Sequence, residues 1–401
     1  MNGCIRKTIA VLGLSMPLLA IAVSVAAGQT FQYPERRHGK GELRYLHGVP
    51  VLTVAGTPEE IGEQIGVLAL KPAARIQDLI RGYAKGSGVP QALTLLTVAG
   101  KSLYRQFPDE YRRELEAMAD AAGVERDTLI LANTIIDLQE IVGCSSLLVG
   151  AKRSATGAPL YGRNLDAPPV NGLAELSLVV VYRPVGKQAF VLTSVPGFLI
   201  FFSGMNAGGL ALGSQSAGPA ADGSRRFNAA GAPSAVAGRR LIERCRTVAE
   251  AEAWLQKNPL ARSVAIAACD LKDQRVIEVT TKTIAARGPA QGICCATNHF
   301  RTPELATATT CWRYAALEKS REIERLTVGD VGRLLHSANQ GASTIHTIVF
   351  EPKPQRIHVS LGVGPSSARP LATLELADLL KGDETGEPSE PRKPTGAPPT
   401  R

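Results

Sequence analysis

Several features are scarce or missing in this 401-residue sequence, and each absence excludes a class of protein. Aromatic residues make up only 5%, and the 45 Lys and Arg residues are scattered and form no cluster interleaved with aromatic residues, although the formal net charge is +9. This pattern argues against a nucleic-acid partner. The sequence has no CxxC pair and no spacing of His and Cys suited to zinc, so we expect neither a metal nor another cofactor.

Apolar runs as long as a membrane span are also missing, so we expect no membrane span. At the amino terminus, Arg6 and Lys7 precede a shorter apolar stretch at 9–23, and small residues follow at 25–27. This arrangement is typical of an export signal. We therefore expect residues 1–27 to be removed and the protein to be secreted or periplasmic. Residues 382–401 are rich in Pro, Gly and charge, and are expected to be disordered.

The seven cysteines raise the question of disulfides in an exported protein. They stand at positions 4, 144, 245, 269, 294, 295 and 311. Loss of the signal removes Cys4, and the even number that remains permits disulfides, but at least one must stay free if Cys144 is catalytic. The alternative for Cys245 and Cys269 is burial as small hydrophobic side chains.

The pattern of hydrophobic residues changes near residue 144. Residues 28–143 are helix-rich after a strand at 50–54, and Thr57 begins a helix with Pro at the first position and Glu at the third. From residue 144 on, strands predominate, and 145–151 with 160–165 predict a hairpin. Further strands are expected at 176–182, 189–193, 209–212, 263–268, 276–280, 345–351 and 356–360, and helices at 76–83, 104–121, 126–140, 235–246, 248–256, 312–326 and 328–337. Two sheets covered by helices, within a domain over 144–381, fit this alternation best.

Cys144 stands where the helical pattern gives way to a strand. A nucleophilic cysteine needs a base, and histidine is the common one. Of the six histidines, only His299 has a position typical of a site. The alternative is cleavage of the bond between Gly143 and Cys144, because the freed α-amino group, with an ordinary pKa of about 7.7–8.0, is then the base. A small residue before the nucleophile and a strand that begins at it suit this chemistry.

The predicted hairpin supplies polar neighbours for Cys144. Folding back is expected to place Asp166 opposite Cys144, with Arg163 nearby. Arg163 and Asp166 are three residues apart, so in a regular strand they face opposite ways. Both reach the site only if the strand bends or ends near Asp166, and the prolines at 168 and 169 favour this. The alternative is an ordinary hairpin with a solvated arginine and an aspartate at its end.

Four motifs occur in an order that resembles a known family. They are Gly143-Cys144-Ser145-Ser146, Gly162-Arg163-Asn164-Leu165-Asp166, Gly204-Met205-Asn206-Ala207-Gly208-Gly209-Leu210 and Thr297-Asn298-His299-Phe300. With Trp312-Arg313-Tyr314 and the segment 345–352, the chain resembles the isopenicillin N acyltransferase-like autoproteolytic family from about residue 54 to 362. These proteins are N-terminal nucleophile hydrolases, distantly related to choloylglycine hydrolases and acid ceramidases.

The resemblance implies an α+β fold, the αββα four-layer sandwich, with a propeptide over 28–143 and Cys144 as the nucleophile. It also implies that Arg163 and Asp166 orient the amine and contact the substrate. Asn298 would donate to the oxyanion, a type of contact that contributes about 3 kcal/mol. Arg313 matches an arginine near the site in related hydrolases. The alternative for Asn298 is an asparagine in a turn, and the alternative for Arg313 is a cation on a helix surface.

One position departs from the family pattern. Relatives usually carry Asn or Glu in the strand after the third motif, whereas this sequence has Gln215 and Ser216. Gln215 supplies both a donor and an acceptor, so it is a candidate for the second oxyanion contact. We count Gln215, Asn206 and His299 as possible oxyanion or substrate contacts.

The sequence thus predicts a secreted, self-processing cysteine hydrolase or acyltransferase that forms a thioester with amide-linked acyl groups. The expected partner is a small-molecule acyl amide, and the two chains of the precursor are expected to stay associated. One alternative is a hydrolase that uses Cys144 and His299 without cleavage. The other is a non-catalytic secreted binding protein with the same sandwich.

Overall fold

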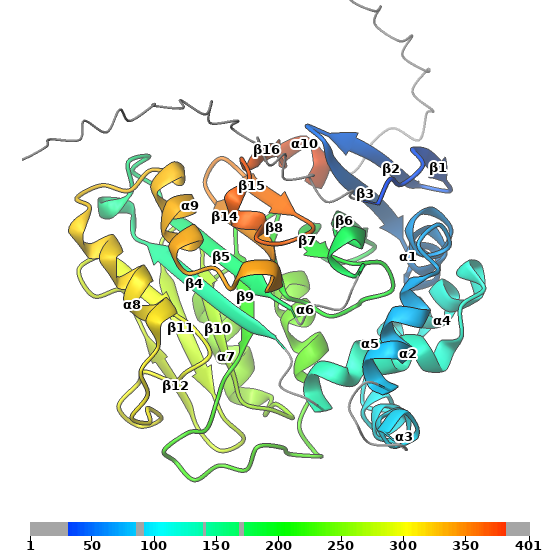
Figure 1. Ribbon diagram of the computed structural model, residues 1–401, viewed down its shortest axis with the longest axis horizontal. Helices are drawn as coiled ribbons and strands as arrows, with labels where there is room; N and C mark the ends of the chain where they lie inside the picture. Colours follow the sequence, from blue (N-terminus) through cyan, green and yellow to red (C-terminus); the bar gives the residue numbers. More distant parts are fainter. Residues whose placement is uncertain (1–30, 86–91, 139–141, 168–171, 382–401) are drawn as a thin grey trace, which may run out of the picture.

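The computed structural model describes residues 31–85, 92–138, 142–167 and 172–381 (Figure 1). The expected export signal and the expected tail at 382–401 lie outside these residues. The described chain forms two sheets with helices on their outer faces, and none of its helices is long and apolar enough to cross a membrane.

The first sheet has ten strands and the second has six. In spatial order, the first consists of β1 (Arg36–His38), β2 (Gly41–Leu46), β3 (Val49–Gly56), β6 (Leu178–Pro184), β7 (Phe190–Ser194), β8 (Ser203–Asn206), β9 (Ala211–Ser216), β10 (Val264–Cys269), β11 (Gln274–Val279) and β12 (Ile284–Arg287). The second consists of β13 (Ile293–Ala296), β4 (Gly143–Val149), β5 (Leu160–Asp166), β14 (Thr344–Glu351), β15 (Arg356–Leu361) and β16 (Ala372–Glu375). Among these strands, β3 and β6 pair in parallel and the other neighbours pair antiparallel.

The helices lie on both sides of the paired sheets. On the ten-stranded sheet pack α1 (Pro58–Ile65), α6 (Ser234–Arg244) and α7 (Val248–Lys257). The helices α2 (Ile76–Lys85), α3 (Ala92–Tyr104), α4 (Asp109–Ala122) and α5 (Arg126–Leu138) pack on these helices and on one another, and join the same core. On the six-stranded sheet pack α8 (Trp312–Glu318) and α9 (Val328–Ser337), while the short α10 (Ala377–Leu380) joins the core between the sheets.

Alternation along the strands builds three apolar cores between four layers. In β5, Leu160 and Gly162 face α9, whereas Tyr161 lies between the two sheets. In β10, Ile266 faces the helices and Ala267 faces the other sheet. Helices, sheet, sheet and helices therefore stack in this order, which confirms the predicted α+β, αββα four-layer sandwich.

The segment before Cys144 is more than the helical layer that its pattern suggested. It also adds β1, β2 and β3 to the ten-stranded sheet, with β3 paired to β6 from beyond Cys144. Two predicted helices are shorter than expected. The helix expected at 104–121 starts at Asp109, since Pro108 precedes it, and the one expected at 312–326 ends at Glu318 and continues as a 3₁₀ turn. The capped start of α1 at Thr57 is confirmed.

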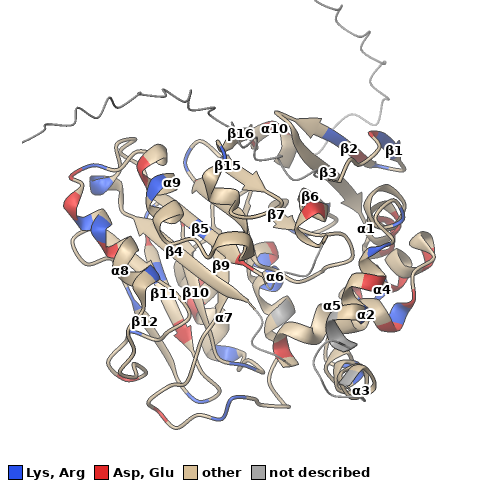
Figure 2. Ribbon diagram, in the orientation of Figure 1, with Lys and Arg blue, Asp and Glu red and all other residues tan. Residues whose placement is uncertain are grey.

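A buried ionic cluster joins the parts of the chain before and after Cys144. Arg239 in α6 donates to both carboxylate oxygens of Glu114 in α4, at 2.8 and 2.6 Å, and to Glu243 at 2.9 Å. The hydroxyl of Tyr111 and the ammonium of Lys187 also donate to Glu243, each at 2.7 Å. We call these five residues the Arg239 cluster. Elsewhere in the view of Figure 2, basic and acidic residues are interspersed on the helices and loops.

The six described cysteines are free thiols in this structure, and all except Cys311 are buried. Cys245 lies in the core under the helices, and Cys269 lies in the core between the sheets. Burial raises the pKa of Cys245 to about 11, so both sites fit the alternative of small hydrophobic side chains.

Candidate active site

Cys144 is the second residue of β4 and is fully buried. It pairs with Leu165, and Gly143 pairs with Asp166, so the expectation that Asp166 lies opposite Cys144 is wrong by one position. The register is set where the hairpin closes, at the pair of Val149 and Leu160. A shift of one residue moves a side chain to the other face of the sheet, so this correction decides which groups meet the thiol.

The thiol side of Cys144 faces the ten-stranded sheet, and Arg163 is on the same face. Nη2 of Arg163 donates to Sγ of Cys144 at 3.1 Å and to the carbonyl oxygen of Ser214 at 2.5 Å. The thiol also lies 3.9 Å from that carbonyl oxygen, in donor geometry. A guanidinium beside a thiol favours the thiolate.

Asp166 lies on the opposite face, beside Gly143. Its carboxylate accepts hydrogen bonds from Thr344 Oγ1 at 2.5 Å and from Gln340 Nε2 at 2.7 Å. A methyl group on Gly143 would lie 2.4 Å from the Gln340 amide nitrogen and 3.2 Å from Cβ of Asp166, so it would have to displace the Gln340 side chain that donates to Asp166. Arg163 and Asp166 therefore reach the Gly143-Cys144 junction from its two faces, and β5 ends at Asp166 as the sequence required.

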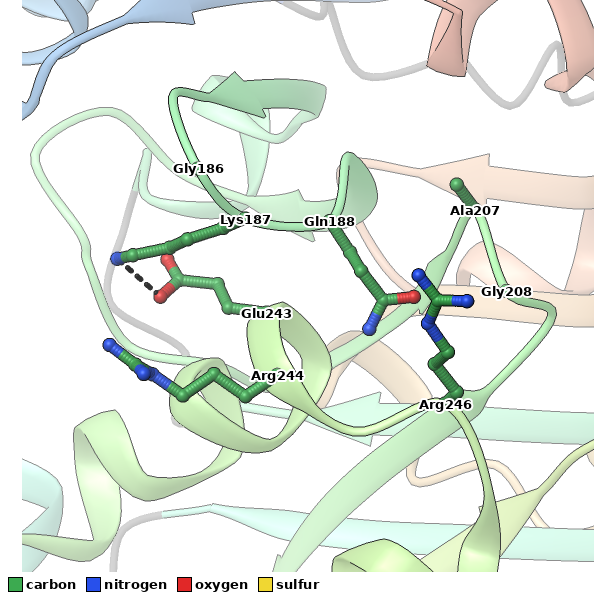
Figure 3. Close-up of a pocket in the computed structure, with 8 residues that line it drawn as sticks. All are labelled: Gly186, Lys187, Gln188, Ala207, Gly208, Glu243, Arg244 and Arg246. Carbon is green, nitrogen blue, oxygen red and sulfur yellow. Dashed lines mark hydrogen bonds and ion pairs between the residues drawn. The ribbon is translucent and has the colours of Figure 1, made fainter.

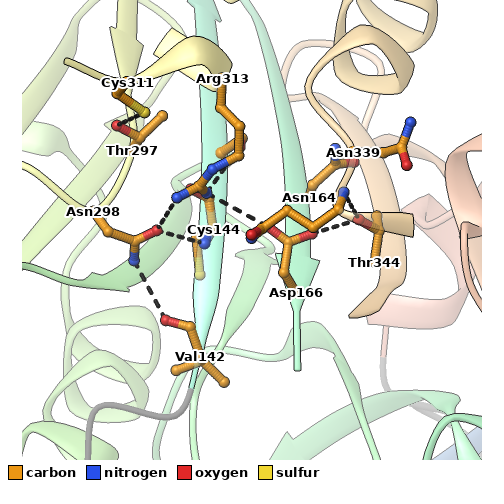
Figure 4. Close-up of polar contacts among 12 residues, drawn as sticks. Val142, Cys144, Asn164, Asp166, Thr297, Asn298, Cys311, Arg313, Asn339 and Thr344 are labelled. Carbon is orange, nitrogen blue, oxygen red and sulfur yellow. Dashed lines mark hydrogen bonds and ion pairs between the residues drawn. The ribbon is translucent and has the colours of Figure 1, made fainter. Parts of the chain in front are cut away.

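Asn298 holds the backbone nitrogen of Cys144 (Figure 4). Its Oδ1 accepts from Cys144 N at 3.0 Å, while its Nδ2 donates to the carbonyls of Ser216 at 2.8 Å and Val142 at 3.4 Å. Two of these partners can only accept and the backbone N–H can only donate, so they fix the orientation of the amide. Asn298 is thus at the site, but its amide hydrogens are both directed at backbone carbonyls.

Arg313, in the first turn of α8, links the other groups. It donates to the carbonyl oxygen of Cys144 at 2.6 Å and to Oδ1 of Asn298 at 2.9 Å, and lies 3.5 Å from Asp166. Figure 4 shows it between Asn298 and Asp166 above the nucleophile. The structure therefore brings together Cys144, Arg163, Asp166, Asn298 and Arg313, the five residues proposed as catalytic from the sequence.

Burial and the neighbouring charges have opposing effects on the pKa of the Cys144 thiol. Burial raises the pKa of the Cys144 thiol, Arg163 and Arg313 oppose this shift, and Asp166 adds to it. Burial also opposes the charge on Arg163, but the neighbouring Cys144 and Tyr161 raise its pKa overall. The thiol is thus neutral at neutral pH in this state, beside a permanent cation that can stabilise its anion.

Gln215, Asn206 and His299, proposed as possible oxyanion or substrate contacts, lie in different places relative to the site. Gln215 is fully buried in β9 between the two serines whose carbonyls touch the site, and within the described chain its amide has no hydrogen-bond partner. Asn206 is not at the site, because all its hydrogen bonds serve the β8–β9 turn and the carbonyls of Ile242 and Cys245. The sequence pattern of a polar residue before Gly-Gly fits such a turn.

His299 is not among the hydrogen-bond partners of Cys144 in the described part of the chain. Among the described residues, no hydrogen bond joins its ring to the thiol, although it follows Asn298 directly. Partial burial lowers its pKa, and Arg301 and Arg313 lower it further. Sequence reasoning missed Ser214, Thr344 and Gln340, since Ser214 acts through its backbone and the other two are far away in the chain.

A narrow hollow adjoins the site. Its cavity of about 20 Å³ is lined near Cys144 by Val142, Ser214 and Ser216, and further out by Ile136, Asp137, Phe201, Phe202, Ser234, Arg262 and Val264. A second hollow of about 290 Å³ shares Asp137 and Arg262 with it and is also lined by Leu138, Arg226 and Phe227. A larger hollow of about 700 Å³ lies beside the Arg239 cluster, and Lys187, Arg244 and Arg246 are among the residues that line it (Figure 3).

Three solved structures of known proteins are similar to this chain over most of their own length. They are an N-acylethanolamine-hydrolyzing acid amidase ortholog of Caenorhabditis elegans (15% identity, 58% of this chain, 100% of that chain, TM-score 0.42), penicillin V acylase of Agrobacterium tumefaciens (14%, 61%, 89%, 0.43) and a mutant of conjugated bile acid hydrolase of Clostridium perfringens (10%, 59%, 93%, 0.43).

No curated protein matches the chain. Residues 153–364, which make up just over half of the sequence, match the family described as acyl-coenzyme A:6-aminopenicillanic acid acyl-transferase. This match confirms the resemblance drawn from the motifs. The matched range contains Arg163, Asp166, Asn298 and Arg313, while Cys144 precedes it. The chain belongs to the acyl-coenzyme A:6-aminopenicillanic acid acyl-transferase family.

Proposed function

We propose that this protein is an exported, self-processing cysteine N-terminal nucleophile enzyme that cleaves amide-linked acyl groups from small molecules. One observation carries the proposal: each reactive part of Cys144 has its own partner. Arg163 contacts the sulfur, Asn298 accepts from the nitrogen, and Arg313 donates to the carbonyl oxygen. Any buried residue needs partners for its backbone N–H and C=O, but a structural cysteine in a core needs no guanidinium on its sulfur.

Self-processing starts at the bond between Gly143 and Cys144. Sγ of Cys144 attacks the carbonyl carbon of Gly143, the C–N bond breaks, and the nitrogen takes the thiol proton to become the α-amino group. This step leaves a thioester between Gly143 and Cys144. Water then hydrolyses the thioester, which yields the carboxylate of Gly143 and the free thiol. Arg163 stabilises the developing negative charge on sulfur, and Asn298 holds the nitrogen that must leave.

In turnover, the freed α-amino group of Cys144 is the base. Its ordinary pKa of about 7.7–8.0 suits the transfer of the thiol proton near neutral pH. The thiolate attacks the acyl carbonyl of the substrate, the amine leaves with that proton, and the thioester passes the acyl group to water or to another amine. Outside the cell, water is the more abundant acceptor.

Asn298 supports the oxyanion after processing. In the precursor, its Nδ2 group donates to Ser216 and Val142. Cleavage frees the chain end that contains Val142, so one N–H of Asn298 becomes available to the substrate oxyanion. Donors of this kind contribute about 3 kcal/mol to lowering the barrier. The proposal thus assigns Asn298 two roles, one before and one after cleavage.

The two halves of the precursor are proposed to stay together as one enzyme. Strand β3 from before Cys144 pairs with β6 from beyond it, and the Arg239 cluster links α4 to α6. Export rests on the charged and apolar pattern of residues 1–27.

The test is intact mass spectrometry with amino-terminal sequencing of purified protein. We expect two chains, one of which starts at Cys144, and a single uncut chain for Cys144→Ala. Cys245→Ala, a buried cysteine in another core, is the matched control and should be cut normally. A single chain in the wild type, with the same mass pattern as Cys144→Ala, contradicts self-processing. Activity on N-acyl amides that survives in Cys144→Ala contradicts the nucleophile.

The alternative with His299 as the base is tested in the same series. His299→Ala should still be cut, and should keep most of its activity, because no hydrogen bond among the described residues ties its ring to the thiol. If the wild-type chain is not cut and His299→Ala loses activity, the results favour a hydrolase of the Cys-His type.

A further inference from the structure

Arg163 is a buried cation without a carboxylate partner. Its side chain is fully buried, and within the described part of the chain it forms no ion pair. Only Nη2 is held, by Cys144 and Ser214, while Nε and Nη1 have no hydrogen bond. A guanidinium fixed at one nitrogen can rotate away from the sulfur, so another feature has to keep it in place.

That feature is a pair of hydroxyl groups on the same face of β4 and β5. Tyr161 precedes Arg163 by two residues, and Ser146 pairs directly with Arg163 across the strands. The hydroxyl groups of Tyr161 and Ser146 are 3.2 Å apart. The ring of Tyr161 is fully buried and stacks on Phe350, with centroids 5.4 Å apart, so its position is fixed.

The facing strand leaves room for this arrangement. An added Cβ at Gly213 in β9 would lie 2.0 Å from the Tyr161 hydroxyl and 2.6 Å from Nη1 of Arg163. The hydroxyl and the guanidinium therefore both lie against the bare backbone of Gly213. Burial raises the pKa of Tyr161, and the charge of Arg163 opposes this shift. Burial disfavours the charge on Arg163, whereas Tyr161 favours it, as expected for a phenol beside a cation.

We propose that Tyr161 and Ser146 are positioning residues that hold the Arg163 guanidinium against the sulfur of Cys144. The proposal requires Tyr161 to be the donor in its hydrogen bond with Ser146, because the lone pairs of the phenol oxygen are then directed at the cation. The inference rests on the proposed function in one respect, because it takes Cys144 as the nucleophile of self-processing. The charged groups near Cys144 are Arg163 on the same face of β5, Asp166 on the opposite face of that strand, and Arg313 from α8.

Tyr161→Phe is the direct test, because it keeps the stacking on Phe350 and removes only the hydroxyl. Precursor recovered from inclusion bodies is refolded into buffers between about pH 5 and 9, and the rate of chain cleavage is followed on gels. We expect cleavage to be roughly tenfold slower at neutral pH, with the midpoint of the pH profile moved to higher pH, because the thiolate loses support. Ser146→Ala should shift the profile in the same direction by a smaller amount.

The matched control is Tyr182→Phe. Tyr182 is also fully buried, stacks on Phe190 with centroids 4.7 Å apart, and has a buried arginine against its ring, but lies in the other core. It should cleave with the wild-type profile.

The outcomes separate the two proposals. If wild-type precursor stays uncut, the proposed self-processing fails. If the wild type is cut and Tyr161→Phe follows the same rate and pH profile, the positioning role is overturned. If Tyr161→Phe does not refold, the Ser146→Ala profile decides, and a profile equal to wild type overturns the inference.

Discussion

Replacing Glu114 with alanine tests how the segment before Cys144 is held to the rest of the protein. Glu114 accepts two hydrogen bonds from Arg239, at 2.8 and 2.6 Å, and both side chains are only 2% exposed. The variant leaves two guanidinium nitrogens without partners in a site that excludes water. Hydrogen bonds to charged groups are worth about 1.5–3 kcal/mol each, and removal of one partner of a buried pair typically costs about 3–5 kcal/mol.

We therefore expect Glu114→Ala to lower the free energy of unfolding by about 3–5 kcal/mol and Tm by on the order of 10 °C. The comparison is made in a Cys144→Ala background, so that every sample is a single chain of the same length. Denaturant unfolding followed by circular dichroism gives the difference, and an unchanged dependence on denaturant shows that the unfolding process is the same.

The control is Glu59→Ala, in the same part of the chain. Glu59 pairs with Arg113 at 2.6 Å, but the two side chains are 47% and 54% exposed. Water screens such a pair, so its removal should change stability by at most about 1 kcal/mol. A Glu114→Ala variant that unfolds within this same margin of its parent refutes the reasoning. In the cut enzyme, Glu114→Ala should also release the amino-terminal chain more readily on gel filtration.

Three further predictions concern the site. Gly143→Ala should slow chain cleavage on gels by at least about tenfold, since its methyl group would lie 2.4 Å from the Gln340 amide, whereas Gly82→Ala, with open space around it, should cleave normally. Thr344→Val should lower kcat and leave KM nearly unchanged, because it removes the hydroxyl that fixes Asp166. The substitution keeps the β-branched shape of the side chain. Burial lowers the pKa of His346 to about 3, and Arg163 lowers it further. Below the ordinary pKa of about 6.5, the unfolded chain therefore binds a proton that the folded protein does not, and the free energy of unfolding falls by about 1.4 kcal/mol per pH unit until about pH 3. His346→Gln should flatten this acid-side slope in unfolding experiments, and an unchanged slope contradicts the assignment.

Much of the site could be predicted because each residue stands in a short motif with local meaning. The glycine before Cys144, the strand that follows it, and the turn at the end of the hairpin are all local patterns. Arg163, Asp166 and Asn298 were located in this way, from the motifs that carry the family resemblance, and the structure brings them to the junction.

Other parts of the site could not be predicted from the sequence. The carbonyl of Ser214 acts whatever its side chain is, so its identity gives no signal. Thr344 and Gln340 reach Asp166 only because β14 pairs with β5, and a contact between segments so far apart in the chain has no local pattern. The register of the hairpin depends on where the turn closes, which composition does not determine within one residue. Asn206 was overestimated because the same Asn-x-Gly-Gly pattern suits a turn and a site.

The one-residue correction in the hairpin has a chemical consequence. Because Cys144 pairs with Leu165, its side chain shares the face of Arg163, while Gly143 and Asp166 share the other face. The thiol is thus contacted by Arg163 in the core between the sheets, whereas the peptide bond to be cut has Asp166 and Arg313 beside it on the helix side. A slip by one residue would put the carboxylate against the sulfur and the guanidinium on the helix side, and would raise the pKa of the thiol further. The register of β4 and β5 is therefore part of the proposed catalytic mechanism, and the separation of the two faces lets a buried cation stabilise sulfur without being neutralised by Asp166.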